Sequence, residues 1–60
     1  MGAVYNPEAE VIAEIERLEL EAREIRRRMA AAKNEQDKRV LERQVQELQQ
    51  AIDVLRKRLP

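Results

Sequence analysis

The stretch that decides the fold is AAAKNEQDKRVLE, residues 30–42, near the middle of a 60-residue chain that otherwise has a helical pattern. Its polar centre, KNEQD at residues 33–37, interrupts the spacing of the apolar residues on either side. If the chain turns back here, the two flanking segments can pack against each other. If it runs straight through, the same segments form one long helix.

The segment before this stretch carries apolar residues at alternating steps of four and three, which is the heptad spacing of helices that pack along one stripe. Asn6 and Pro7 mark the start of the helix, because Asn is a good cap and Pro suits the first helical position. We therefore predict a helix over about residues 7–33. Its seam consists of Val11, Ile15, Leu18, Ala22, Ile25 and Met29.

The segment after the stretch carries a second seam with the same spacing, which consists of Leu41, Val45, Leu48, Ile52, Leu55 and Leu59. Its frame is offset by two residues, which rotates the stripe by about 200° at about 100° per residue. A continuous coiled coil absorbs insertions of three or four residues more easily. We expect Asn34 to end the first helix as a left-handed cap and Asp37 to cap the second. This predicts a turn over about 34–37 and a helix over about 38–59.

These elements predict an all-α fold, an antiparallel helical hairpin in which every layer pairs an a position with a d position. Leu18, for example, then faces Ile52. Residues 1–6 form an N-terminal extension, and residues 7–60 form a single domain. The alternative is one unbroken helix that makes the same pairs in an antiparallel dimer, since neither Pro nor Gly interrupts residues 30–42.

A single hairpin of this size needs further support, because it shields each seam residue from one side only. Disulfides and histidine-bound metals are excluded by composition, so association remains. We expect a homodimer that forms a four-helix bundle, although the mixed seam leaves trimers and tetramers open. The candidates for a second interface are Ile12, Leu20, Val40, Gln44, Ala51 and Val54, of which the last four fall on one flank.

The distribution of charge favours an antiparallel dimer, with the two turns at opposite ends. The net charge is zero, but residues 25–45 carry seven basic and three acidic side chains, and the rest carry five basic and nine acidic ones. Antiparallel packing places each basic turn beside the acidic termini of the other copy. Screening over about 8–10 Å limits this effect to a preference.

The composition argues against an enzyme and against a bound cofactor or metal. Cys, His, Ser and Thr are absent, Gly2 is the only glycine, and neither seam contains a carboxylate. The chain also lacks an apolar run that could span a membrane or serve as a signal-peptide core. Together with the absence of cysteine, this leads us to expect a cytoplasmic protein.

The expected function is that of a structural or protein-interaction module, which self-associates through its seams and can also dock a helical partner. The alternative is a small nucleic-acid-binding regulator that uses basic residues near the turn. No aromatic residue lies among them to stack on bases, and nearby Glu side chains can neutralise them. The residues that would contact nucleic acid are Arg26, Arg27, Arg28, Lys33, Arg39 and Arg43.

In length and helix layout, the chain resembles the small helical-hairpin dimers. No sequence motif is shared, so the resemblance concerns architecture and assigns a role to no residue. It implies a hairpin that pairs with a second copy to form a four-helix bundle.

Overall fold

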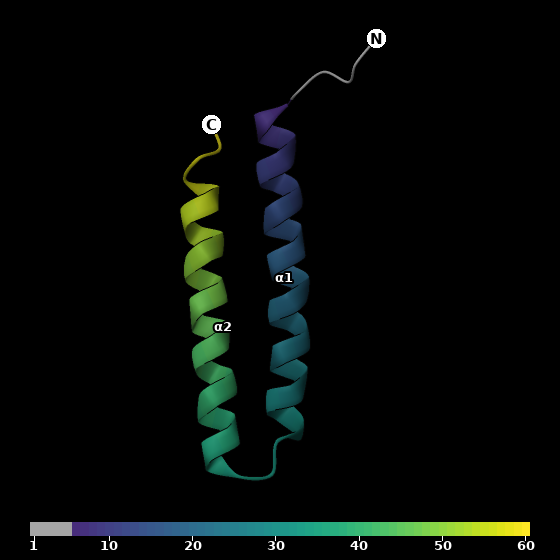
Figure 1. Cartoon of the computed structure of the whole chain (residues 1–60), viewed down its shortest axis with the longest axis vertical. Coiled ribbons are helices and arrows are strands. Elements are labelled where there is room, and N and C mark those ends of the chain that lie inside the picture. The colour runs from purple at the N-terminus through teal and green to yellow at the C-terminus, as the bar shows by residue number, and fades with distance from the viewer. Residues whose placement is uncertain (1–5) are drawn as a thin grey trace.

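The computed structural model describes residues 6–60, which form two α-helices joined by a short turn. Helix α1 spans Pro7–Ala31 and helix α2 spans Glu35–Arg56. The helices run antiparallel, so that the end of α2 lies beside the start of α1 (Figure 1). The predicted helical hairpin is confirmed, and the unbroken helix is excluded. Apart from Asn6, the predicted N-terminal extension lies outside the described residues.

The start of α1 follows directly from its sequence. Asn6 has an extended backbone (φ −125°), and its side-chain Oδ1 accepts hydrogen bonds from the N–H groups of Glu8 (3.1 Å) and Ala9 (3.2 Å). Pro7 occupies the first helical position, where a missing N–H costs nothing. Glu8 and Glu10 lie in the first turn, where the helix dipole favours negative charge.

The turn differs from the prediction in position and in chemistry. The loop comprises only residues 32–34, because α2 already begins at Glu35 and not after residue 37. Asn34 is extended (φ −129°), and no residue from 6 to 60 has a positive φ. The prediction of a left-handed Asn34 at the end of α1 was therefore wrong.

Asn34 instead caps the start of α2, the role predicted for Asp37. Its Oδ1 accepts the N–H of Asp37 at 2.8 Å, and its Nδ2 donates to the Asp37 carboxylate at 3.0 Å. Asp37 is the third residue of the helix rather than its cap. Asn suits both helix ends, so sequence preference alone did not distinguish the two roles.

Both helices end slightly earlier than predicted. Helix α1 ends at Ala31, two residues before the predicted end at residue 33, and is followed by an extended Ala32 whose N–H donates to the Met29 carbonyl. Helix α2 ends at Arg56, three residues before the predicted end at residue 59. The N–H groups of Arg58 and Leu59 there bond to carbonyls three residues back, which tightens the chain into a narrower turn. Pro60 explains this ending, since the residue before a proline avoids helical geometry.

The core lies between the helices and follows the two seams. Ile15, Leu18 and Ile52 form its buried cluster, and Val11, Leu48, Leu55 and Leu59 pack against it. This group includes Leu18 and Ile52, the two members of one predicted layer. All twelve seam residues are buried or half-buried.

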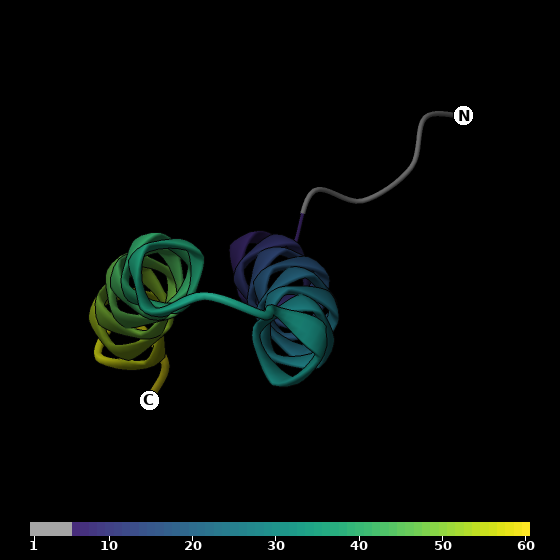
Figure 2. The same cartoon turned by 90° about the horizontal axis from the view of Figure 1, so that it is seen from below.

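The burial is uneven between the two helices. Helix α1 buries four residues of its seam, whereas α2 buries only Ile52. Seen along the helix axes, the described chain is one layer of two helices, and neither broad face is covered by a third element (Figure 2). The second seam is therefore left partly exposed.

Candidate interaction surface

The hairpin has two broad faces, which the heptad positions distinguish. Ile15 and Ile52 occupy a positions, and Leu18 and Leu48 occupy d positions. In an antiparallel pair, the e and b positions of both helices lie on the side of the a residues, and the g and c positions lie on the side of the d residues. The two faces therefore present different sets of side chains.

The face on the side of the a residues is crossed by an ion pair, and we call it the bridged face. Arg56 Nη2 donates to Glu19 Oε2 at 2.6 Å, and both residues are at e positions. Within residues 6–60, this is the only ion pair that joins the two helices.

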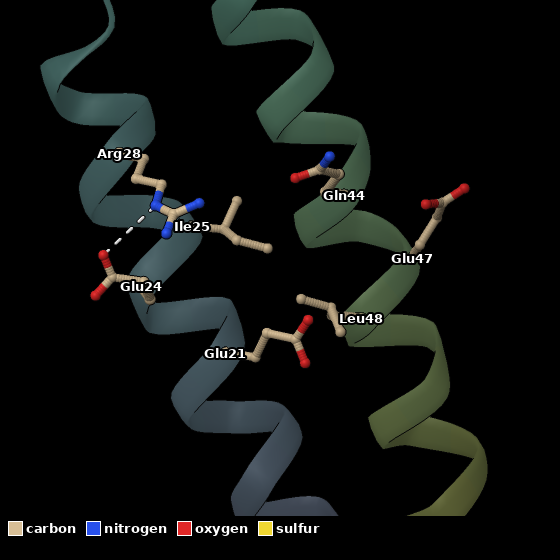
Figure 3. Close-up of a pocket in the computed structure, with 7 residues that line it drawn as sticks. All are labelled: Glu21, Glu24, Ile25, Arg28, Gln44, Glu47 and Leu48. Atoms are coloured by element: carbon tan, nitrogen blue, oxygen red, sulfur yellow. Dashed lines mark ion pairs between the residues drawn. The ribbon is translucent and has the colours of Figure 1, made fainter.

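The opposite face contains two hollows between the helices, and we call it the groove face. Ile25 and Leu48 lie at the first hollow and point toward the space between the helices (Figure 3). Val11 and Leu55 are their counterparts at the second hollow, near the open end. All four are d residues, so the floor of the groove is apolar. Of the residues that line the two hollows, only Glu8 is not at a c, d or g position.

The c and g positions form the two rims of the groove, and these rims differ in charge. The rim on α1, which we call the acidic rim, consists of Glu10, Glu14, Arg17, Glu21, Glu24 and Arg28. From residue 40 onward, the rim on α2, which we call the neutral rim, consists of Val40, Gln44, Glu47, Ala51, Val54 and Arg58. Asp37, in the first turn of α2, is also at a g position but lies beside the turn, and we do not count it in this rim. The neutral rim has one charge of each sign, and apolar or amide side chains make up the rest.

Ion pairs along the acidic rim hold its side chains in place. Arg17 contacts Glu14 at 2.7 Å and Glu21 at 3.6 Å, and Arg28 contacts Glu24 at 3.6 Å. The Arg17 guanidinium donates two hydrogen bonds to the Glu14 carboxylate, which lowers the pKa of Glu14 and raises the pKa of Arg17. Each side chain in these three pairs is at least 42% exposed, so each pair contributes little to stability by itself.

The six candidates for a second interface do not lie together. Val40, Gln44, Ala51 and Val54 all belong to the neutral rim, and all four are exposed. Leu20 is also exposed, but it is at an outer f position and lines a separate hollow with Arg23 and Arg27; Ile12 is at an e position. The groove face therefore brings together four of the six.

The six basic residues proposed to contact nucleic acid are all exposed near the turn, but they point in different directions. Arg27 and Arg28 both pair with Glu24. By heptad position, Arg26 belongs to the bridged face and Arg28 to the groove face. These residues therefore surround the end of the hairpin instead of forming one continuous basic surface.

Three lining residues of the first hollow, Glu21, Glu24 and Glu47, are not among the residues predicted to form an interface. Their c and g positions were the signal that could have placed them beside the seam.

In residues 6–60, no group of three His, Cys, Asp or Glu side chains is arranged to hold a metal ion. The same residues include no helix that is both long and apolar enough to cross a membrane. Comparisons of the chain with protein-family models, curated proteins and solved structures find no match.

Proposed function

We propose that this chain is a non-enzymatic protein-interaction module that self-associates through its seams into a homodimeric four-helix bundle. One observation carries the proposal. Helix α2 buries only Ile52 within the hairpin, so the other five large apolar residues of its seam remain incompletely buried. Those residues are Leu41, Val45, Leu48, Leu55 and Leu59.

The exposed apolar residues beside this seam support the same proposal. Val40 and Val54 are each 52% exposed and lie along the partly open seam. Single exposed apolar residues are common on protein surfaces, but Val40, Ala51 and Val54 form a row on one rim beside an incompletely buried core, which indicates an interface. A second hairpin would cover this row and the seam together, which is how four-helix bundles complete their core.

The charge distribution supports a dimer with its turns at opposite ends. The excess of basic residues lies at residues 25–45, around the turn, and the excess of acidic residues lies at the end with the termini. An antiparallel arrangement of the two hairpins places unlike charges side by side at both ends of the bundle. Such charge complementarity mainly selects the orientation and contributes less to the affinity.

Sedimentation equilibrium, with circular dichroism recorded on the same dilution series, tests this proposal. We expect a species of about 14 kDa, twice the chain mass of 7.1 kDa, at micromolar concentration. Helicity and mass should fall together on dilution, because the core is completed only by association. A species of 7.1 kDa that keeps full helicity at every concentration would contradict self-association, and three or four times that mass would contradict the dimer.

The alternative function, nucleic-acid binding, depends on the basic residues near the turn. Their spread over several sides of the hairpin does not favour it, because a duplex or stem contacts one side of a protein. We expect no complex in gel-shift titrations with duplex DNA and structured RNA at low salt. A complex that is lost when Arg39 and Arg43 are replaced by Gln would reverse this ranking of the two functions.

A further inference from the structure

We infer that the second copy in the proposed homodimer covers the groove face, with its α2 against α2 of the first copy and the two-fold axis near Ala51. The inference rests on the proposed self-association and adds the face, the pairing of helices and the position of the axis. Each of these three additions follows from the side chains of the described residues.

The choice of face follows from the cost of removing charges from water. On the bridged face, the flank of α2 consists of Arg39, Glu42, Gln46, Gln49, Asp53 and Arg56. Covering that flank would desolvate four charged side chains and break or bury the Glu19–Arg56 ion pair. On the groove face, the neutral rim has only two charged residues, and the floor is apolar. For α2, covering the groove face therefore desolvates fewer charges and more apolar surface, and it leaves the Glu19–Arg56 ion pair in water. The six charged residues of the acidic rim then need partners in the second copy.

The pairing of helices follows from the symmetry of two hairpins packed face to face. If the two-fold axis runs along the bundle, the turns lie at the same end and α2 of one copy lies against α1 of the other. If the axis runs across the bundle, the turns lie at opposite ends, and α2 lies against α2 and α1 against α1. The rims therefore meet either unlike or like partners, depending on the symmetry.

The acidic rim fits a second acidic rim better than it fits the neutral rim. In the antiparallel pairing of α1 with α1, Glu10 meets Arg28 and Arg17 meets Glu21, and only Glu14 and Glu24 oppose like charges. In the other arrangement, the charged side chains of this rim lie against Val54 and Ala51, which desolvates them without a partner in the second copy. Packing α2 against α2 instead joins two neutral rims.

The position of the axis follows from the same pairing. The pair of α1 helices is centred on residue 19 when Glu10 lies opposite Arg28 and Arg17 lies opposite Glu21. Within the hairpin, Leu18 and Ile52 share the core cluster, so residue 19 lies level with about residue 51 of α2. The two Ala51 residues then face each other across the axis, where a small side chain lets two helices approach closely.

Charge substitution at Ala51 tests the inference, because this position is exposed in the single hairpin. Ala51→Arg and Ala51→Glu are measured separately and as an equimolar mixture by sedimentation equilibrium and circular dichroism. Arg and Glu are both good helix formers, so neither substitution disfavours the helix itself. Ala13→Arg is the matched control, since Ala13 is exposed at an outer f position of α1.

We expect each Ala51 variant alone to raise the Kd of the dimer at least about tenfold, because like charges then meet at the axis. The mixture should restore the dimer and its helicity, and Ala13→Arg should leave the Kd unchanged. A tighter dimer with Ala51→Arg would show that α2 meets the acidic rim of α1, which overturns the inference. The inference is also overturned if the Ala51 variants behave like Ala13→Arg, or if their mixture fails to dimerise. In those cases a dimeric wild type still supports the proposed function. A monomeric wild type would contradict the proposed function and the inference together.

Discussion

The two faces of the hairpin are built from the same two helices but differ in how complete they are. The bridged face is spanned by the Glu19–Arg56 ion pair, and charged side chains of both signs flank it. The groove face has an apolar floor, one acidic rim and one neutral rim, and no ion pair spans it within residues 6–60. The proposed second copy therefore covers the groove face and leaves the bridged face in water.

This difference arises from the positions beside the seam and not from the seam itself. Both seams follow the same heptad spacing, and their twelve residues are all at least half-buried. What distinguishes the faces is that α2 carries Val40, Ala51 and Val54 at its c and g positions but only charged and Gln side chains at its b and e positions. A heptad seam thus predicts that helices pack, and its flanks indicate which side remains available.

The largest effect is expected at the layer that supports both faces. Ile52 is 1% exposed, and a charge at this position would be buried without a partner. Ile52→Asp should cost about 4 kcal/mol or more, which would remove both the helicity and the proposed dimer at micromolar concentration. Circular dichroism and sedimentation equilibrium measure this. Gln50→Asp, an exposed change on the same helix, should retain both; a helical and soluble Ile52→Asp variant would contradict the assigned core.

The next effect compares the neutral rim with an exposed apolar residue elsewhere. Val54→Gln should weaken the dimer by about 2 kcal/mol, counting about 1 kcal/mol of lost apolar burial in each copy. Leu20→Gln is the matched control, since Leu20 is 61% exposed at an outer position. Dilution followed by sedimentation equilibrium separates the two variants. Equal weakening by both changes would show that the groove face has no special role.

The turn joins both faces, and its cap should contribute a smaller amount. Asn34→Ala removes the acceptor for the Asp37 N–H and should lower the free energy of unfolding by about 1 kcal/mol. Gln36→Ala, within the first turn of α2, is the control for the change in helix propensity. Thermal unfolding at constant protein concentration measures the difference. An unchanged midpoint for Asn34→Ala would argue against the observed cap.

The ion pair on the bridged face should contribute less than the cap. Glu19 and Arg56 are both partly exposed, and such pairs contribute below about 1 kcal/mol. Glu19→Gln should therefore lower the free energy of unfolding slightly, and the loss should shrink as salt is added. Glu16→Gln, a nearby exposed change, serves as the control. A large loss, independent of salt, would show that the bridged face is also covered by a partner.

The smallest effect concerns the acidic rim and its dependence on pH. Arg17 lowers the pKa of Glu14 in the folded chain, so the stabilisation is complete above the ordinary Glu pKa and is lost as the pH falls through the lowered value. Titration of the Glu14 carboxyl carbon by NMR should show this low pKa. Arg17→Gln should return it to the ordinary range. An ordinary pKa in the unmodified chain would contradict the observed pair.

The sequence was sufficient to predict the hairpin and its seam because heptad spacing directly reports which side of each helix is apolar. The offset of the second seam correctly indicated the break in the helix. The role of Asn34 could not be predicted, since Asn favours both the left-handed end of one helix and the cap of the next. The early end of α2 was missed because Leu59 continued the apolar pattern beyond the last helical residue.

The candidate surface was only partly predictable. The row of Val40, Gln44, Ala51 and Val54 was visible from spacing, but the hollows beside it depend on how two helices pack. Ile12 and Leu20 were grouped with that row because they are apolar, although they lie on other sides of α1. Apolar character alone does not reveal direction around a helix, and heptad position does.

The most direct test of this account is the distance between spin labels at position 36 in the assembled protein. The chain has no native cysteine, so Gln36→Cys gives one labelled site per copy, at an exposed position beside the turn. With turns at opposite ends and the axis near Ala51, pulsed dipolar spectroscopy should give about 45 Å, from a rise of about 1.5 Å per residue in each copy. Neighbouring helices in a bundle are about 8–10 Å apart, so the two labels come close together if both turns lie at the same end of the bundle. They also come close together if the chain is one unbroken helix in an antiparallel dimer, because position 36 then lies near the middle of the rod. A distance below about 30 Å would therefore contradict the account. The absence of any dipolar coupling between copies would contradict self-association itself.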